Sequence, residues 1–258
     1  MTPLSPSVHL YPTLHDRDIL NQKEYASIIG SLRYLTDCTR PDISYAVGML
    51  GRFTSKPNSF HWECIKHLMG YLCATKNYGL CYQRYPAILE GFCDADWNTL
   101  LGDSLSVSGY IFKIGGGAVS WKSKKQQIIA KSTMEAEMIS LALASEEASW
   151  LRDLLFEIPL WEKPVPPILI HCDSTTAIYK VNNRFYNRFY NGKSRSIRRK
   201  HSIVRSYLDN GTIHVDYIPS SENIADPFTK ALAREKIWIT SRGMGLKPKE
   251  CGTSYEDT

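Results

Sequence analysis

The stretch that decides the fold is LEGFCD, residues 89–94, an apolar run that a carboxylate closes. A second run of this kind, ILIHC at residues 168–172, is followed at once by Asp173. Two more carboxylates, Glu137 and Asp226, stand near the start of helical patterns. Acidic oxygens gathered where strands and helices end are suited to hold hard divalent cations. These four acids are therefore the first candidates for a functional site.

Outward from residues 89–94, the pattern predicts a sheet. Three runs separated by turn-rich segments indicate an antiparallel meander: 89–94, 108–113 and 117–121. The unalternating run at 168–172 follows a helical pattern and is typical of a central parallel strand. A last strand is expected at 212–218, where apolar and polar residues alternate.

The longest predicted helix covers residues 133–157. Ser132 and Glu135 have the S-x-x-E spacing of a capping box, which gives Glu135 a structural role. Glu137 instead continues into the apolar stripe of the helix, and an inward carboxylate is costly unless it is paired or binds a metal. That stripe consists of Leu141, Ala144, Ala148, Leu151 and Leu155. A final helix is expected near Pro227.

The net charge of +5 is concentrated in one window. Residues 174–208 contain nine basic residues and no acidic one. A basic helix is expected in the second half of this window, with an apolar seam that includes His201. Its five basic residues point chiefly outward: Arg195, Arg198, Arg199, Lys200 and Arg205. A charge run is usually a solvated face, but the lack of compensating acids favours a polyanionic partner.

The cysteine content and the apolar runs exclude several classes of protein. Seven cysteines without a CxxC pair argue against a disulfide framework or a zinc ribbon and favour a reducing compartment. Residues 1–14 lack the pattern of a secretory signal, and no apolar run approaches the roughly 20 residues that span a bilayer. We expect an intracellular protein, in cytoplasm or nucleus, that is not secreted and has no membrane partner.

The order of the predicted elements resembles the ribonuclease H fold, an α/β fold with a mixed five-stranded sheet and flanking helices. Several sequence words are similar to those of the ribonuclease H domain of copia-type retrotransposon Pol polyproteins. They are GFCDADW (91–97), SGYIF (108–112), GGGAVSWKSKKQ (115–126), STMEAE (132–137), CD (172–173) and NIADPFTK (223–230). Upstream, GSLRYL (30–35), RPDI (40–43) and HW (61–62) are similar to the end of the same family's reverse transcriptase.

The resemblance implies a domain order along the chain. Helical patterns at 22–37, 42–53 and 59–75 fall within a C-terminal remnant of a reverse transcriptase. The expected division is a tail at 1–20, the remnant at 21–84, a ribonuclease H-like domain at 85–238 and a second tail at 239–258. The Tyr-x-Asp-Asp motif of the polymerase is missing, so no DNA synthesis is expected from this chain.

The resemblance also implies an activity and a site. The implied activity is that of a ribonuclease H, an endonuclease that hydrolyses the RNA strand of RNA–DNA hybrids with two Mg²⁺ ions, or with Mn²⁺ in their place. The implied ligands are Asp94, Glu137, Asp173 and Asp226. The implied partners are the hybrid and the remainder of a reverse transcriptase.

Alternatives remain open at each site residue. Asp96 has the same strand parity as Asp94, although position at the strand's end favours Asp94. Asp173 and Asp226 each have a plain alternative as helix caps. A catalytically silent nucleic-acid-binding remnant would keep the same fold, so it is the second functional hypothesis.

Overall fold

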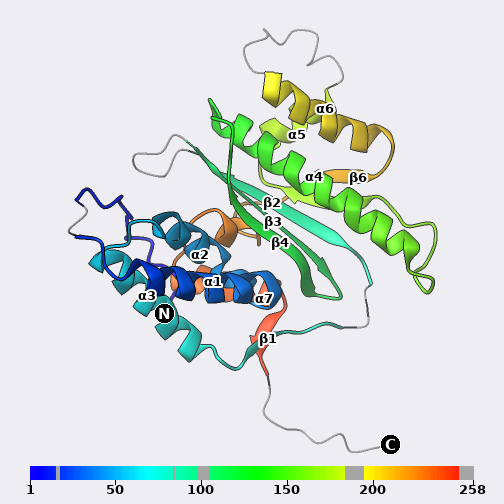
Figure 1. The fold of residues 1–258 in the computed structure, drawn as a ribbon. Helices are drawn as coiled ribbons and strands as arrows, with labels where there is room; N and C mark the ends of the chain where they lie inside the picture. Colours follow the sequence, from blue (N-terminus) through cyan, green and yellow to red (C-terminus); the bar gives the residue numbers. More distant parts are fainter. Residues whose placement is uncertain (16–17, 84, 86, 98–104, 184–194, 250–258) are drawn as a thin grey trace, which may run out of the picture.

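A mixed five-stranded sheet forms the centre of the computed structural model (Figure 1). The described residues are 1–15, 18–83, 85, 87–97, 105–183 and 195–249. The strands are β2 (Glu90–Asp96), β3 (Val107–Ile114), β4 (Gly117–Lys125), β5 (Ile168–Cys172) and β6 (Ile213–Tyr217), in the order β4-β3-β2-β5-β6. β2, β3 and β4 form an antiparallel meander, whereas β5 and β6 run parallel to β2. The predicted ribonuclease H-like fold is confirmed.

Helices cover both faces of this sheet (Figure 1). One face carries α4 (Thr133–Glu157), α5 (Thr175–Asn182) and α6 (Arg195–Asp209). The other side carries α1 (Gln22–Cys38), α2 (Ser44–Leu50), α3 (Ser59–Ala74) and α7 (Arg234–Gly243). No helix in the described ranges combines the length and the apolar character that a membrane crossing needs.

The core on the α4 side explains why β2 and α4 meet. Cys93, Tyr110 and Phe112 point from the strands into one buried cluster with the predicted apolar stripe of α4. All five residues of that stripe are buried, as expected from their helical spacing. Because strand side chains alternate, the neighbours of Cys93 in β2 face the other side of the sheet. That second face is the one that presents Asp94.

The helical segment before the sheet has a core of its own. Tyr25, Leu50 and Leu68 are buried there together with Leu232 and Ile237, which come from the C-terminal part of the chain. The short strands β1 (Tyr78–Leu80) and β7 (Leu246–Pro248), which are also far apart in sequence, pair with each other. The division at residues 20, 84 and 238 stays a prediction.

Two helical predictions needed correction. The pattern at 42–53 is divided into η2 (Pro41–Ile43), α2 and η3 (Gly51–Phe53), since the ends of an α-helix often tighten into 3₁₀ turns. The helix expected near Pro227 is only the 3₁₀ turn η5 (Asp226–Phe228). The N–H of Thr229 donates to the Asp226 carbonyl and closes the turn, and α7 begins later, at Arg234.

Candidate metal centre

Asp94 lies on β2, on the face of the sheet that η5 covers. The residue is 2 % exposed, and its Oδ2 accepts a hydrogen bond from the Thr229 hydroxyl. The sequence had suggested that Asp94 ends its strand. However, β2 continues to Asp96, so Asp94 lies inside the strand. Among the described residues, Asp94 approaches the other predicted acids, while Asp96 joins none of their groups. Proximity therefore favours Asp94 over Asp96.

Asp226 is completely buried at the first position of η5. A second buried residue, Asn223, holds the turn against β2. Its side-chain amide donates to the carbonyl of Cys93 at 3.0 Å, and its Oδ1 accepts from the N–H of Ala225 at 3.0 Å. These bonds fix Asp226 beside Asp94. Sequence reasoning did not select Asn223, although Asn shortly before an Asp-Pro pair is a typical turn signal.

Glu137 projects from the second turn of α4 toward the same region and is 8 % exposed. Its Oε1 accepts a hydrogen bond from the N–H of Ala95 at 3.3 Å. Its Oε2 is buried and has no hydrogen-bond partner within the described part of the chain. The hydroxyl of Ser140 donates to the carbonyl of Asp94 at 2.6 Å and so ties this end of α4 to β2.

Asp173 follows β5 directly and is half-buried. Its Oδ2 accepts from the Ser220 hydroxyl at 2.6 Å. The alternative role as a helix cap is taken by its neighbour, because the side chain of Ser174 accepts from the N–H of Ala177 and caps α5. Asp226 has no capping bond either, since it lies within η5 and Ala225 precedes the turn.

The four acids form two overlapping groups that share Asp173. Asp94, Asp173 and Asp226 offer ligand atoms that lie within 4.8 Å of one another, and Glu137, Cys172 and Asp173 do the same. The thiol of Cys172 is a soft ligand, so the carboxylate oxygens are the ones that suit Mg²⁺ or Mn²⁺. The unsatisfied Oε2 of Glu137 adds a buried acceptor that no donor of the described residues reaches. This donor set fits hard divalent cations.

Burial and mutual repulsion change the proton affinity of these acids. Desolvation, together with the charges of Asp226 and Asp173, raises the pKa of Asp94 to about 7, against the opposing effect of Lys230. Desolvation also raises the pKa of Glu137 well above its ordinary value, with repulsion from Asp94 and Asp173 adding to it. Both carboxyls therefore hold protons more tightly than exposed acids do, unless a cation replaces the proton.

Two lysines that sequence reasoning missed supply positive charge to this centre. The Nζ of Lys230 lies 3.1 Å from Oδ1 of Asp226 and 3.8 Å from Oδ2 of Asp94. Burial alone would lower the pKa of Lys230, but the two carboxylates outweigh it and raise that pKa. The Nζ of Lys236, from α7, contacts Oδ2 of Asp226 and donates to the carbonyl of Ser220. The buried charge of Asp226 is thus balanced within the chain.

The raised pKa of Asp94 predicts a pH-dependent stability. Between about pH 4 and pH 7 the folded, metal-free protein keeps a proton that the unfolded chain has released, so this contribution to stability is lost as pH rises. A Mg²⁺ ion held by the ionised carboxylates would restore that stability. We expect the urea midpoint to respond to Mg²⁺ more strongly at about pH 8 than at about pH 5.5. An Asp94→Asn variant with an undiminished Mg²⁺ response would contradict this assignment.

Glu135 lies two residues from Glu137 but has a structural environment. Its N–H donates to the hydroxyl of Ser132, which caps α4. Its Oε2 accepts from the N–H of Lys131, the residue before the cap, at 2.9 Å. The predicted difference between the two glutamates is therefore visible in their contacts: Glu135 bonds to the start of its own helix, and Glu137 reaches β2.

The predicted basic helix is α6, with Ile197, His201 and Val204 buried on its inner side. Arg195, Arg198 and Arg199 are exposed. These three arginines, with Ser202 and Ile203, line a surface hollow of about 400 Å³. Residues 184–194 of this window lie outside the described residues.

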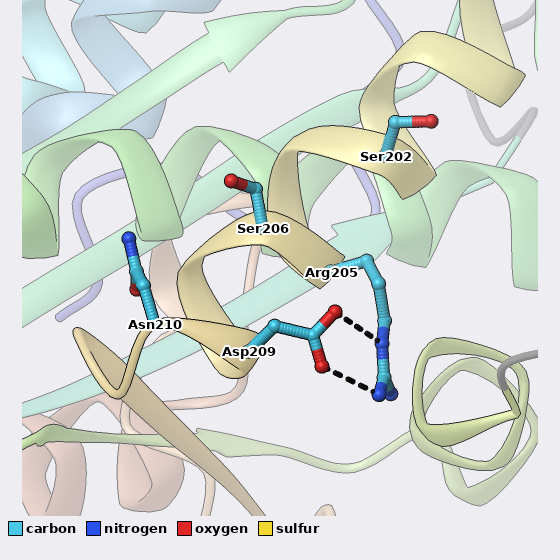
Figure 2. A pocket seen from close by; sticks show the side chains of 5 residues that line it. All are labelled: Ser202, Arg205, Ser206, Asp209 and Asn210. Carbon is cyan, nitrogen blue, oxygen red and sulfur yellow. Dashed lines mark hydrogen bonds and ion pairs between the residues drawn. The ribbon is translucent and has the colours of Figure 1, made fainter.

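Two of the five predicted basic residues are engaged with acids of this chain. Lys200 pairs with Glu146 of α4 at 2.9 Å. Arg205 forms a bidentate pair with Asp209 one turn later, beside Ser202, Ser206 and Asn210 (Figure 2). Its guanidinium also donates to the carbonyl of Val181. The expectation of a window without compensating acids was therefore wrong for these two residues, because their partners lie outside it in sequence.

Comparison with known proteins gives long matches to mobile-element polyproteins. The chain is 35% identical over 234 residues to the retrovirus-related Pol polyprotein from transposon TNT 1-94 of Nicotiana tabacum, a match that covers 91% of this chain and 17% of that protein. It is 34% identical over 255 residues to the Pol polyprotein from transposon RE2 of Arabidopsis thaliana, with 97% and 17% covered. The chain thus spans about a sixth of these relatives. No family model matches it.

The similarity to solved structures is weaker. A ribonuclease H1, LC11, solved in complex with an RNA/DNA hybrid, aligns with 55% of this chain and 93% of its own length, at 16% identity and a TM-score of 0.37. The fold assignment therefore rests on the strand order and strand directions described above.

Proposed function

This chain belongs to the retrovirus-related Pol polyproteins of copia-type transposons, and from that premise we propose that it is a metal-dependent ribonuclease H that cuts the RNA strand of RNA–DNA hybrids. The chain corresponds to about a sixth of those polyproteins, so the activity is proposed for this segment alone.

The observation that carries the proposal is the convergence of four acids from four separate segments. Asp94 comes from β2, Glu137 from α4, Asp173 from the end of β5 and Asp226 from η5. Burying like charges together is unfavourable for folding alone, and neighbouring acids add to the burial that raises the pKa values of Asp94 and Glu137. Such an arrangement is expected where its purpose is to bind cations.

The chemistry is an in-line hydrolysis in which the oxygen of water forms a bond to phosphorus and the bond to the 3′ oxygen breaks. Two divalent cations, when bound, would activate that water and stabilise the leaving oxygen. Asp94, Asp173 and Asp226 would hold one of the two cations, and Glu137 with Asp173 would hold the other. Asn223 and Ser140 orient this set by fixing η5 and α4 to β2.

The experiment that tests the proposal compares three substrates of one sequence: an RNA–DNA hybrid, duplex DNA and duplex RNA. With Mg²⁺ or Mn²⁺, we expect cleavage of the hybrid alone, and none with a chelator present. Equal cleavage of duplex RNA would refute hybrid specificity, and cleavage that survives the chelator would refute metal dependence.

A catalytically silent nucleic-acid-binding remnant is the second candidate. The observation in its favour is that Lys230 and Lys236 already balance the charge of Asp226 without a cation. A silent remnant should bind the hybrid but show no cleavage, and its thermal midpoint should not respond to Mg²⁺. A rise of the midpoint with Mg²⁺ together with cleavage removes this candidate.

The exposed arginines of α6 are proposed to bind the backbone of the hybrid. Removing one phosphate-binding side chain should reduce the slope of log K against log salt by about 0.9, so Arg198→Ala with Arg199→Ala should flatten it by up to about two units. The control is Lys23→Ala with Lys76→Ala, two exposed lysines of α1 and the α3–β1 turn on the other side of the sheet. If the arginine variant behaves like this control, the basic face of α6 contacts only solvent and not the hybrid.

A further inference from the structure

A positively charged site lies where the helical segment meets the sheet. Its hollow, which we name the basic cleft, measures about 290 Å³ and opens between α1, α2 and the end of β4. No carboxylate is among the residues that line it. The lining residues that matter here are Arg33, Tyr45, Arg52, Ser123, Lys124 and Lys125. Three positive side chains from two different parts of the chain, those of Arg33, Arg52 and Lys125, thus converge on one hollow, whereas the side chain of Lys124 projects to the opposite face of β4.

The strand register gives the distance between the basic cleft and the acids. Asp94 pairs with Gly109, and Gly109 pairs with Ser123, which lines the cleft. Since neighbouring strands lie about 4.8 Å apart, Ser123 is about 10 Å from Asp94 across the sheet. Paired residues project to the same face, so Ser123 in the cleft and Asp94 share one face of the sheet. The hydroxyl of Ser123 also donates to the carbonyl of Phe228 in η5, at 2.5 Å.

The two walls of the basic cleft are connected by a direct bond. The indole N–H of Trp121, on β4, donates to the carbonyl of Thr36, on α1, at 2.6 Å. The wall formed by the helical segment is therefore fixed against the wall formed by the sheet. A ligand in the cleft meets an arrangement of charges that exists before it binds, which reduces the entropic cost of binding.

Tyr45 adds a neutral donor to these charges. Burial raises the pKa of its phenol to about 12, with the Asp96 charge adding to the effect and Arg52 opposing it. The phenol therefore stays protonated near neutral pH. A hydroxyl donor among lysine and arginine side chains suits the oxygens of a phosphate group.

We propose that the basic cleft binds the sugar–phosphate backbone of the substrate duplex at a point away from the phosphate that is cut. The inference rests on the proposed function and extends it, because it gives the helical segment half of a substrate site. A separation of about 10 Å is on the scale of the distance between two backbones across a minor groove, which is about 6 Å wide in B-form DNA and wider in A-form duplexes. One duplex can therefore reach the acids and the cleft together.

The test is a binding measurement that needs no cleavage. Fluorescence anisotropy with a labelled hybrid and Ca²⁺ in place of Mg²⁺ gives the dissociation constant at several salt concentrations. The test variant is Arg33→Ala with Lys125→Ala, one residue from each wall. The matched control is Lys23→Ala with Lys122→Ala, which removes the same charge from exposed positions on the same helix and strand outside the cleft.

We expect the cleft variant to bind about tenfold or more weakly and to have a salt slope smaller by up to about two units, while the control stays near wild type. A cleft variant with the affinity and slope of the control overturns the inference, and so does a wild-type chain without salt-dependent binding. Failure of the proposed function has a different signature. A wild-type chain that binds the hybrid through the cleft but does not cut it leaves this inference standing.

Discussion

Glu137→Gln should reduce cleavage of a hybrid by at least about a hundredfold while leaving the fold intact. The amide keeps an oxygen that can accept from the N–H of Ala95, so the contact of α4 with β2 survives. It removes the charge of a buried carboxylate whose second oxygen has no protein partner in the described ranges. Single-turnover cleavage measures the decrease, and urea denaturation should show a stability equal to or above that of the wild type, since desolvation of a charge is relieved.

The matched control for that variant is Glu135→Gln, the same change two residues earlier on the same helix. Glu135 bonds to the backbone at the start of α4, and Gln preserves an acceptor there. Its cleavage rate should stay within about twofold of wild type, and its stability should change by no more than about 1 kcal/mol. An inactive Glu135→Gln beside an active Glu137→Gln would show that the two roles are reversed.

Gly109→Ala should damage both activity and stability, although Gly109 carries no functional group. A Cβ at this position would lie 2.5 Å from Cβ of Phe228 and 3.0 Å from Cγ2 of Thr229. The Cβ of Phe228 is bonded directly to the backbone of the turn that presents Asp226, so the turn must move away from β3. Overpacking of this kind costs about 1–3 kcal/mol. A shift of about 1 Å in a ligand can lower the rate about a hundredfold.

Gly30→Ala is the control for that prediction. Nothing lies within 4 Å of a Cβ placed there, and Gly30 is inside α1, where alanine is the better helix former. We expect a gain of up to about 1 kcal/mol and an unchanged cleavage rate. A fully active and equally stable Gly109→Ala would mean that η5 is not held against the sheet as described.

The features that the sequence predicted well are those whose pattern is sustained over many residues or that belong to a long motif. Helix 133–157 and strand 168–172 were placed at the bounds of α4 and β5, because the burial pattern repeats over several turns or is apolar throughout. The meander was found for the same reason, although β2 and β4 extend further than expected. The grouping of the four acids was predicted from their expected positions at the ends of such elements, although Asp94 lies within β2.

The features that were missed depend on contacts between distant segments. β1 and β7 have three residues each, too few for any period, and they exist through their pairing with each other. Lys236 reaches Asp226 only because α7 begins after a separate turn. Lys200 is neutralised by Glu146, 54 residues earlier in the chain. Local patterns carry no record of such pairings, whereas tertiary packing decides them.

The central claim is that four converging carboxylates hold cations that direct water onto a phosphate of the RNA strand. The most direct measurement is the chemistry of the product ends from a hybrid whose two strands carry different labels, incubated with the wild-type chain and Mg²⁺. We predict that only the RNA strand is shortened, that its fragments end in a 3′-hydroxyl and begin with a 5′-phosphate, and that a chelator stops the reaction. Fragments that end in a 2′,3′-cyclic phosphate, or an uncut RNA strand, would contradict the account.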